Sequence, residues 1–182
     1  MKKPKVTLKN IKFHEGHDTM IGLNADIWID GVKCMHVHDD AYGGCFEYHN
    51  FTYQNPKAEQ IKTLIKNLED YIAQLPEKDY EFGGRKHKMK VDMDMYINDL
   101  VEEWETEKNR KKFENQKNKL MQKAILIGVP DGKEYKYFNF KKPLSEINPL
   151  VLEGHVKDIK HKHCKDGKVI LNTNLAEHGI TI

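Results

Sequence analysis

The chain has 182 residues, of which 38% are hydrophobic and 32% are charged, and this balance excludes a globally disordered protein. Its 30 lysines and arginines nearly offset its 28 aspartates and glutamates, so the net charge of +2 gives no strong overall field toward polyanions or membranes. Any basic surface must therefore be local.

Nearly all of the basic residues are lysines. Arg85 and Arg110 are the only two arginines, which leaves 28 lysines among the 30 basic residues. Arginine recognises guanine edges with two hydrogen bonds, so its scarcity argues against sequence-specific reading of DNA. A lysine-rich composition is also typical of an AT-rich genome, which is the plain alternative to a functional reason.

The N-terminal segment and the number of cysteines indicate the cellular compartment in which we expect the protein. Met-Lys-Lys-Pro-Lys-Val is not followed by an apolar run, so we expect no signal peptide, and no stretch approaches the roughly 18 apolar residues of a membrane span. Three cysteines are an odd count, which favours free thiols in a reducing compartment: Cys34, Cys45 and Cys164. We expect a cytoplasmic protein without membrane contact, with an extracellular form carrying a Cys34–Cys45 disulfide as the alternative.

The first part of the chain has the pattern of an antiparallel meander. Four stretches have the alternation or composition of strands, and they cover residues 5–13, 21–29, 32–38 and 45–53. Asp30-Gly31 is a hairpin turn signal between the second and the third stretch. Residues 39–44 form a loop before the fourth.

An amphipathic helix is predicted from Pro56 to Leu75. Its apolar residues recur at helical spacing and form one stripe of Ile61, Leu64, Ile65, Leu68, Ile72 and Leu75. A meander followed by such a helix is a natural packing unit, in which the helix covers one face of the sheet. Residues 77–90, which come next, have the composition of a polar loop with Gly83-Gly84 inside it.

A long charged helix is predicted over residues 92–123. Its first half carries an apolar stripe from Met93 to Trp104, whereas residues 105–119 contain only Phe113 as a large apolar side chain. A helix that is polar all round extends into solvent or bridges to a partner. At about 1.5 Å per residue it reaches about 48 Å, more than a small core needs, so we expect a partial projection or a break near Asn109.

The C-terminal part adds strands and a short helix. Residues 124–129 and 134–140 are predicted as strands around a turn, and residues 169–171 as another strand. Asn148-Pro149 resembles an N-cap followed by proline in the first turn of a helix. Together these elements predict an α+β fold, with antiparallel hairpins packed on an amphipathic helix and the charged helix inserted. We expect residues 1–182 to form a single domain.

One cluster of side chains has the chemistry of a metal site. Alternate residues of a strand share a face, so two adjacent strands present six polar side chains together: Cys34, His36, His38, Cys45, Glu47 and His49. Pairing across the loop sets His38 opposite Cys45, His36 opposite Glu47 and Cys34 opposite His49. Cysteine and histidine favour zinc, and the predicted ligands are Cys34, His36, His38, Cys45 and His49. The alternative is a solvent-facing surface whose reverse side holds Met35, Val37, Phe46 and Tyr48.

Lysine-rich clusters are the second candidate site. They occur at residues 85–90, 108–112, 117–123 and 157–168. A lysine face would bind nucleic-acid phosphates, and the predicted contact residues are Arg85, Lys86, Lys88, Lys108, Arg110, Lys111 and Lys112. The alternative is a plain solvated helix, because its acids come first and its bases last, an order that complements the helix dipole.

We predict a non-enzymatic binding or accessory protein that acts through this lysine-rich face on nucleic acid or on a protein assembly. No cofactor is expected. The first alternative is a metal-dependent hydrolytic enzyme that uses zinc at the Cys34–His49 hairpin. The second is a structural protein whose long helix and exposed aromatic residues form oligomer contacts, although the sequence indicates no particular oligomeric state.

Overall fold

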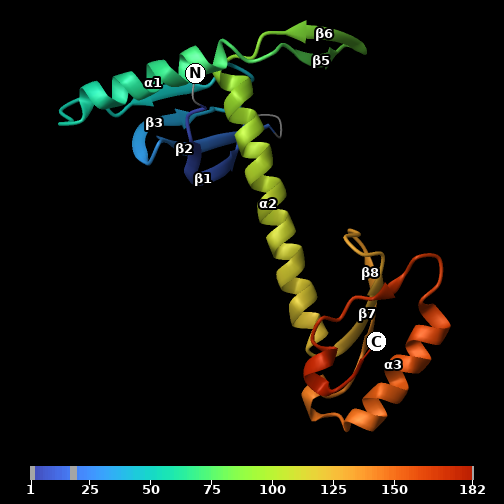
Figure 1. Cartoon of the computed structure of the whole chain (residues 1–182). Coiled ribbons are helices and arrows are strands. Elements are labelled where there is room, and N and C mark those ends of the chain that lie inside the picture. The colour runs from blue at the N-terminus through green and yellow to red at the C-terminus, as the bar shows by residue number, and fades with distance from the viewer. Residues whose placement is uncertain (1–2, 17–19, 182) are drawn as a thin grey trace. The chain divides into compact units, whose positions relative to one another are not determined.

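The computed structural model describes residues 3–16 and 20–181, which form antiparallel sheets and three α-helices (Figure 1). The predicted α+β class is thereby confirmed. The chain divides into two compact units, Met1–Thr106 and Glu107–Ile182, and the single domain expected over residues 1–182 stays a prediction. The division follows from separate hydrophobic cores, because each unit buries its own apolar side chains around its own sheet. Within the described ranges, no helix is both long and apolar enough to cross a membrane.

The first unit is built on a four-stranded antiparallel sheet. Its strands lie in chain order and are β1 (Val6–Glu15), β2 (Ile21–Ile29), β3 (Val32–His38) and β4 (Glu47–Asn50). Asp30 and Gly31, with φ of 49° and 82°, form the tight turn between β2 and β3. Alternation on β2 sends four apolar side chains to one face, where they are buried: Leu23, Ala25, Ile27 and Ile29.

Helix α1 (Ala58–Ile72) covers the apolar face of this sheet (Figure 1). The predicted stripe buries Ile61, Ile65, Leu68 and Ile72 in the same core as β2 and β3, and it leaves Leu64 half-buried. Because the helix covers one face only, the opposite face of the sheet keeps its polar side chains.

A β-bulge in β3 changes which side chains share a face. Lys33 pairs with Trp28 and Met35 pairs with Ile27, so Cys34 is an extra residue on this strand. An extra residue breaks the simple alternation of faces. Cys34 and Met35 are consequently both buried, at 0% and 2% exposure.

Residues 77–90, predicted as a polar loop, contain a hairpin instead. Strand β5 (Lys78–Phe82) pairs with β6 (Arg85–Met89) in a separate two-stranded sheet, which extends away from α1 and the four-stranded sheet in Figure 1. Gly83 and Gly84 close the hairpin with φ of 58° and 72°, as a tight two-residue turn requires. Every residue of β6 is exposed, so no apolar alternation marks this strand in the sequence.

Helix α2 (Met93–Met121) matches the predicted range of 92–123 and runs through Asn109 without a break. Its first turns bury Tyr96 and Ile97 in the core of the first unit. Its last turn buries Met121 in the second unit, with Leu120 packed beside it. The helix continues because its second half also has a core to pack on.

The second unit is built on a three-stranded antiparallel sheet in the order β8-β7-β9. Its strands are β7 (Ala124–Gly128), β8 (Tyr135–Asn139) and β9 (Val169–Ile170). All of β7 is buried, because α3 (Pro149–His163) packs on one face and the end of α2 packs on the other. Asn148 accepts a hydrogen bond from the Leu150 amide at the start of α3, as its N-cap position predicts. Two 3-10 turns complete the unit, at Leu144–Glu146 and Leu175–His178.

Candidate functional site

The two units carry opposite net charges. Residues 107–182 contain 16 lysines and arginines against 9 aspartates and glutamates, a net charge of +7. Residues 1–106 contain 14 against 19, a net charge of −5, and the two values together give the +2 of the whole chain. The near-neutral total of the whole chain therefore hides a unit with a clear excess of positive charge.

Lysines gather on the exposed side of the second half of α2. The inward side is set by Phe113, whose ring centroid lies 5.4 Å from that of Tyr135, and by the buried Met121. At 3.6 residues per turn, the opposite side carries Lys108, Lys111, Lys112, Asn115 and Lys119, all of them exposed. We call Lys108, Lys111, Lys112 and Lys119 the lysine face.

Arg110, a predicted contact residue, lies outside the lysine face. Its guanidinium donates hydrogen bonds of 2.8 Å from Nε and from Nη2 to the Glu107 carboxylate, and Lys111 Nζ lies 3.3 Å from the same group. The hydrogen bonds from Arg110, followed by the contact with Lys111, lower the pKa of Glu107 to about 2. One carboxylate thus offsets part of the charge of two cations. Lys112 and Lys119, by contrast, have no acidic partner within ion-pair distance among the residues described.

The other three predicted contact residues lie on the hairpin of the first unit. Lys86 pairs with Glu81 and Lys88 pairs with Asp79, so each lysine faces an acid across the two strands, whereas Arg85 lies on the reverse side. Residues 78–90 still carry five lysines and arginines against two acids, in a unit whose net charge is −5. The hairpin is therefore a basic segment on an acidic unit.

The predicted metal ligands are only partly brought together. In the observed register His38 lies opposite Glu47, and His36 lies opposite His49. The predicted pairing of His38 with Cys45 is wrong by two residues, because β4 begins only at Glu47 and Cys45 is exposed in the loop before it. The two histidines of β3 and the two partners on β4 nevertheless share the polar face of the sheet.

Cys34 leaves this group altogether. The bulge turns its side chain into the core, where it is fully buried and its thiol donates to the Val32 carbonyl at 3.3 Å. Burial raises the pKa of the Cys34 thiol, which disfavours the thiolate that a metal ion requires. In the part of the chain that the structure describes, no three His, Cys, Asp or Glu side chains are arranged to hold a metal ion. The zinc hypothesis therefore loses the ligand set on which it was built.

Asp26 is the centre of the polar face. It is 6% exposed, and its carboxylate accepts a hydrogen bond from Asn10 Nδ2 at 2.7 Å. Lys33 Nζ lies 2.9 Å from this carboxylate and His36 Nδ1 lies 3.0 Å from it. Burial alone would raise the pKa of Asp26, but hydrogen bonds from these partners outweigh burial and lower the pKa to about 2. Asp26 is therefore charged at neutral pH and joins three strands.

Asn24 orients two further histidines on the same face. His38 Nδ1 lies 2.8 Å from Asn24 Oδ1, and His14 Nδ1 lies 3.2 Å from Asn24 Nδ2. An amide oxygen only accepts and an amide nitrogen only donates, so this arrangement assigns a proton to Nδ1 of His38 and a lone pair to Nδ1 of His14. The two rings stack with centroids 5.7 Å apart. We did not predict Asn24 or Asp26, although the alternation of β2 was the signal that would have found them.

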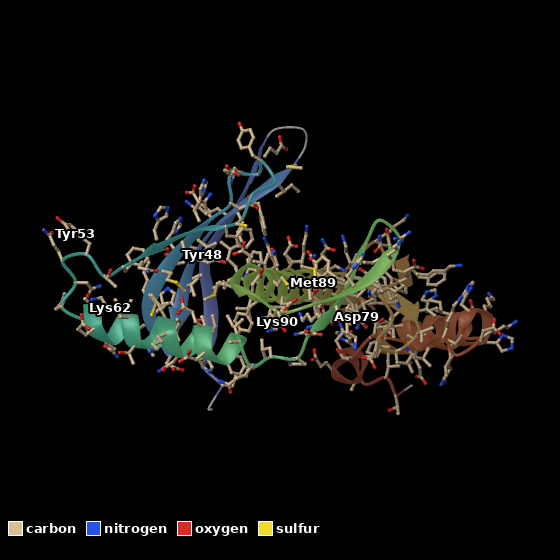
Figure 2. The ribbon with its side chains drawn as sticks, turned by 90° about the horizontal axis from the view of Figure 1, so that it is seen from above. Tyr48, Tyr53, Lys62, Asp79, Met89 and Lys90 are labelled. Carbon is tan, nitrogen blue, oxygen red and sulfur yellow. The ribbon has the colours of Figure 1, made fainter. Side chains whose placement is uncertain are left out.

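Asp94, near the start of α2, connects that helix to β4. Its carboxylate accepts hydrogen bonds from the Tyr48 hydroxyl at 2.7 Å and from the Phe46 amide at 3.0 Å. Burial, followed by the hydrogen bond to Asp94, raises the pKa of Tyr48, which is labelled in Figure 2. Asp92 caps the same helix by accepting from the Met95 amide. Both acids therefore have structural partners.

Two polar surfaces result, one in each unit. On the sheet of the first unit, the side chains around Asp26 and Asn24 are engaged mainly with one another. On α2, the ammonium groups of Lys112 and Lys119 are open to an external anion. No protein-family model matches this chain, and no curated protein or solved structure matches it either, so the evidence for function is the geometry described above.

Proposed function

We propose that this protein is a non-enzymatic nucleic-acid-binding protein whose second unit binds phosphates through the lysine face of α2. The observation that carries this proposal is the net charge of +7 in residues 107–182, with four exposed lysines on one side of one helix. From Lys108 to Lys119 the helix rises about 17 Å, at about 1.5 Å per residue. That length matches roughly five phosphates along one strand of a duplex, which is enough for each lysine to contact one.

The chemistry of lysine determines the kind of recognition. An ammonium group is a compact point charge that binds phosphate oxygens without reading base edges. Binding releases condensed counterions, so the affinity depends steeply on salt and weakly on sequence. This mode suits a chain with 28 lysines and two arginines. It is the mode of an accessory protein that coats or tethers a strand.

Charge reversal on the lysine face tests the proposal. The variant Lys108→Glu, Lys111→Glu, Lys112→Glu should lose at least roughly tenfold in affinity for fluorescently labelled single-stranded and double-stranded oligonucleotides at low salt. Fluorescence anisotropy measures the affinity, and circular dichroism checks that the helices remain. A wild-type protein that binds neither oligonucleotide at low salt would reject the proposal and leave a protein assembly as the partner.

A matched reversal on α3 is the control. Lys157→Glu, Lys160→Glu, Lys162→Glu changes the same net charge on a helix that packs on the other face of the β7 sheet. This variant should lose clearly less affinity than the α2 variant, because it leaves the lysine face intact. Equal losses would show that the charge of the unit matters and that the lysine face has no special role.

A reducing compartment such as the cytoplasm is part of this proposal. All three cysteines are free thiols, and Cys34 is buried while Cys45 is exposed in a loop. The fold therefore does not depend on the Cys34–Cys45 disulfide that an extracellular form would carry.

A further inference from the structure

We infer that the β5–β6 hairpin is a second contact surface, in the first unit, which stacks the bases of single-stranded nucleic acid on Tyr80. This inference rests on the proposed nucleic-acid-binding function and adds a preference for unpaired strands. The strand register of the hairpin, the exposure of its side chains and its charge carry the argument.

One face of the hairpin carries opposite charges across its two strands. Asp79 lies opposite Lys88 and Glu81 lies opposite Lys86, and opposite charges at such positions stabilise a strand pair. The glycine pair at the turn supplies the required positive φ angles. An isolated hairpin is only marginally stable in water, and the opposed charges and the glycine turn both favour the pairing of its two strands.

The reverse face is aromatic and basic. Tyr80 lies directly opposite His87, and Arg85 and Met89 flank His87 on the same side of β6. Tyr80 is 50% exposed and Met89 is 47% exposed, and neither belongs to a hydrophobic core. Figure 2 shows Met89 on this hairpin, well separated from Tyr53 at the far end of α1. Tyrosine, histidine and arginine are the side chains on which unpaired bases stack.

Charge selects the partner for this face. Lys78, at the base of the hairpin, is paired with Asp99, whereas Arg85 and His87 lie on a side of the hairpin that carries no acid. Residues 78–90 carry five basic residues and two acids, although the unit to which they belong has a net charge of −5. This local positive charge favours an anionic partner. A duplex hides the faces of its bases and a single strand exposes them, so a single strand is the partner that uses both the ring and the charge.

Removal of the Tyr80 ring tests the inference. Tyr80→Ala should weaken binding of the full chain to a labelled single-stranded oligonucleotide roughly tenfold, and it should change the affinity for a duplex less than twofold. Tyr80→Trp keeps a stacking surface and should retain the affinity of the wild type. The salt dependence of binding should stay the same in all three proteins, because a tyrosine ring releases no counterions.

Tyr53→Ala is the matched control, since Tyr53 is 86% exposed and lies at the opposite end of α1 from the hairpin (Figure 2). This variant should bind like the wild type. Equal losses for Tyr80→Ala and Tyr53→Ala, or equal losses on single strand and duplex, would overturn the inference. Unchanged single-strand affinity of Tyr80→Ala would overturn it as well, and it would leave a protein as the partner of this face. A wild-type protein that binds no nucleic acid would reject the proposed function and this inference with it.

Discussion

Single residues on the polar face of the sheet link its strands. Asp26 on β2 contacts Asn10 on β1 and both Lys33 and His36 on β3. Asn10 reaches this carboxylate from an irregularity in β1, where its φ of 54° is one that asparagine adopts more readily than most residues. A buried carboxylate without partners would destabilise the fold, so these contacts make Asp26 a structural link.

Replacing Asp26 tests this link through its pH dependence. Its folded pKa of about 2 lies below its ordinary value of 3.8, so its charge stabilises the fold above pH 3.8, and this contribution is lost as the pH falls through about 2. The shift corresponds to about 2 kcal/mol. Asp26→Asn should lower the free energy of unfolding at pH 7 by about that amount. Between pH 4 and pH 2, the free energy of unfolding should change less in this variant than in the wild type. Urea denaturation at several pH values measures both effects.

An exposed carboxylate on the same sheet supplies the control for Asp26. Glu47→Gln removes a charge whose side chain is 65% exposed and lies 3.8 Å from His49 Nε2. Such a pair contributes at most about 1 kcal/mol. Equal stability of Asp26→Asn and the wild type at pH 7 would contradict the structural role of Asp26.

The reactivity of the three cysteine thiols tests the position of the bulge in β3. Cys45 is exposed, Cys164 is half-buried, and Cys34 is buried with a raised pKa. A thiol reagent should therefore modify Cys45 first in the folded protein and Cys34 only on unfolding, since the thiolate is the reactive form. Mass spectrometry of labelled peptides follows each site. Rapid labelling of Cys34 in the folded protein would place it on the solvent face and contradict the bulge.

The candidate site could be predicted in part at the residue scale. Lys108, Lys111 and Lys112 form a charge cluster in the sequence and lie together on an exposed side of α2, while their contact with nucleic acid stays a prediction. Arg110 lies on another side of α2, because two residues along a helix turn a side chain by about 200°, and its contact with nucleic acid stays a prediction. Cys34 was misplaced because one extra residue in a strand reverses the alternation on which the prediction depended.

At the scale of elements, long periodic segments were predictable and short polar ones were not. Helix α1 was expected at residues 56–75 and spans Ala58–Ile72, because its apolar stripe is the dominant local signal. The β5–β6 hairpin was missed because both of its faces are in water, which leaves no apolar alternation to read. The register of β3 and β4 was predicted wrongly. The alternation of side chains indicated a strand from Cys45, whereas β4 begins two residues later, at Glu47.

Helix α1 supplies a direct test of the first core. Leu68 is fully buried between the helix and the sheet. Leu68→Ala should lower the free energy of unfolding by about 2–5 kcal/mol, through lost apolar burial and the cavity that remains. Chemical denaturation measures the change, and the exposed Lys66→Ala on the same helix should alter it by less than about 0.5 kcal/mol. Similar denaturation midpoints for the two variants would show that α1 does not pack as described.

At the scale of the whole molecule, charge and core divide at the same place. The boundary between residues 106 and 107 lies inside α2, where neither composition nor periodicity marks it, so a single domain was the natural expectation. The second core was present in the sequence as the apolar run of β7, but its separation from the first depends on long-range packing. Because the units have charges of −5 and +7, the total of +2 conceals the difference in charge between them.

The salt dependence of binding tests the central claim most directly. Each phosphate contact adds about 0.9 to the slope of log affinity against log salt for a duplex, and about 0.7 for a single strand. The slope should be steep for the wild type, nearly the same for unrelated sequences, and shallower by about 2–3 in the variant Lys108→Glu, Lys111→Glu, Lys112→Glu. Fluorescence anisotropy over a series of salt concentrations measures it. Identical slopes for the wild type and this variant would show that the lysine face does not bind phosphates.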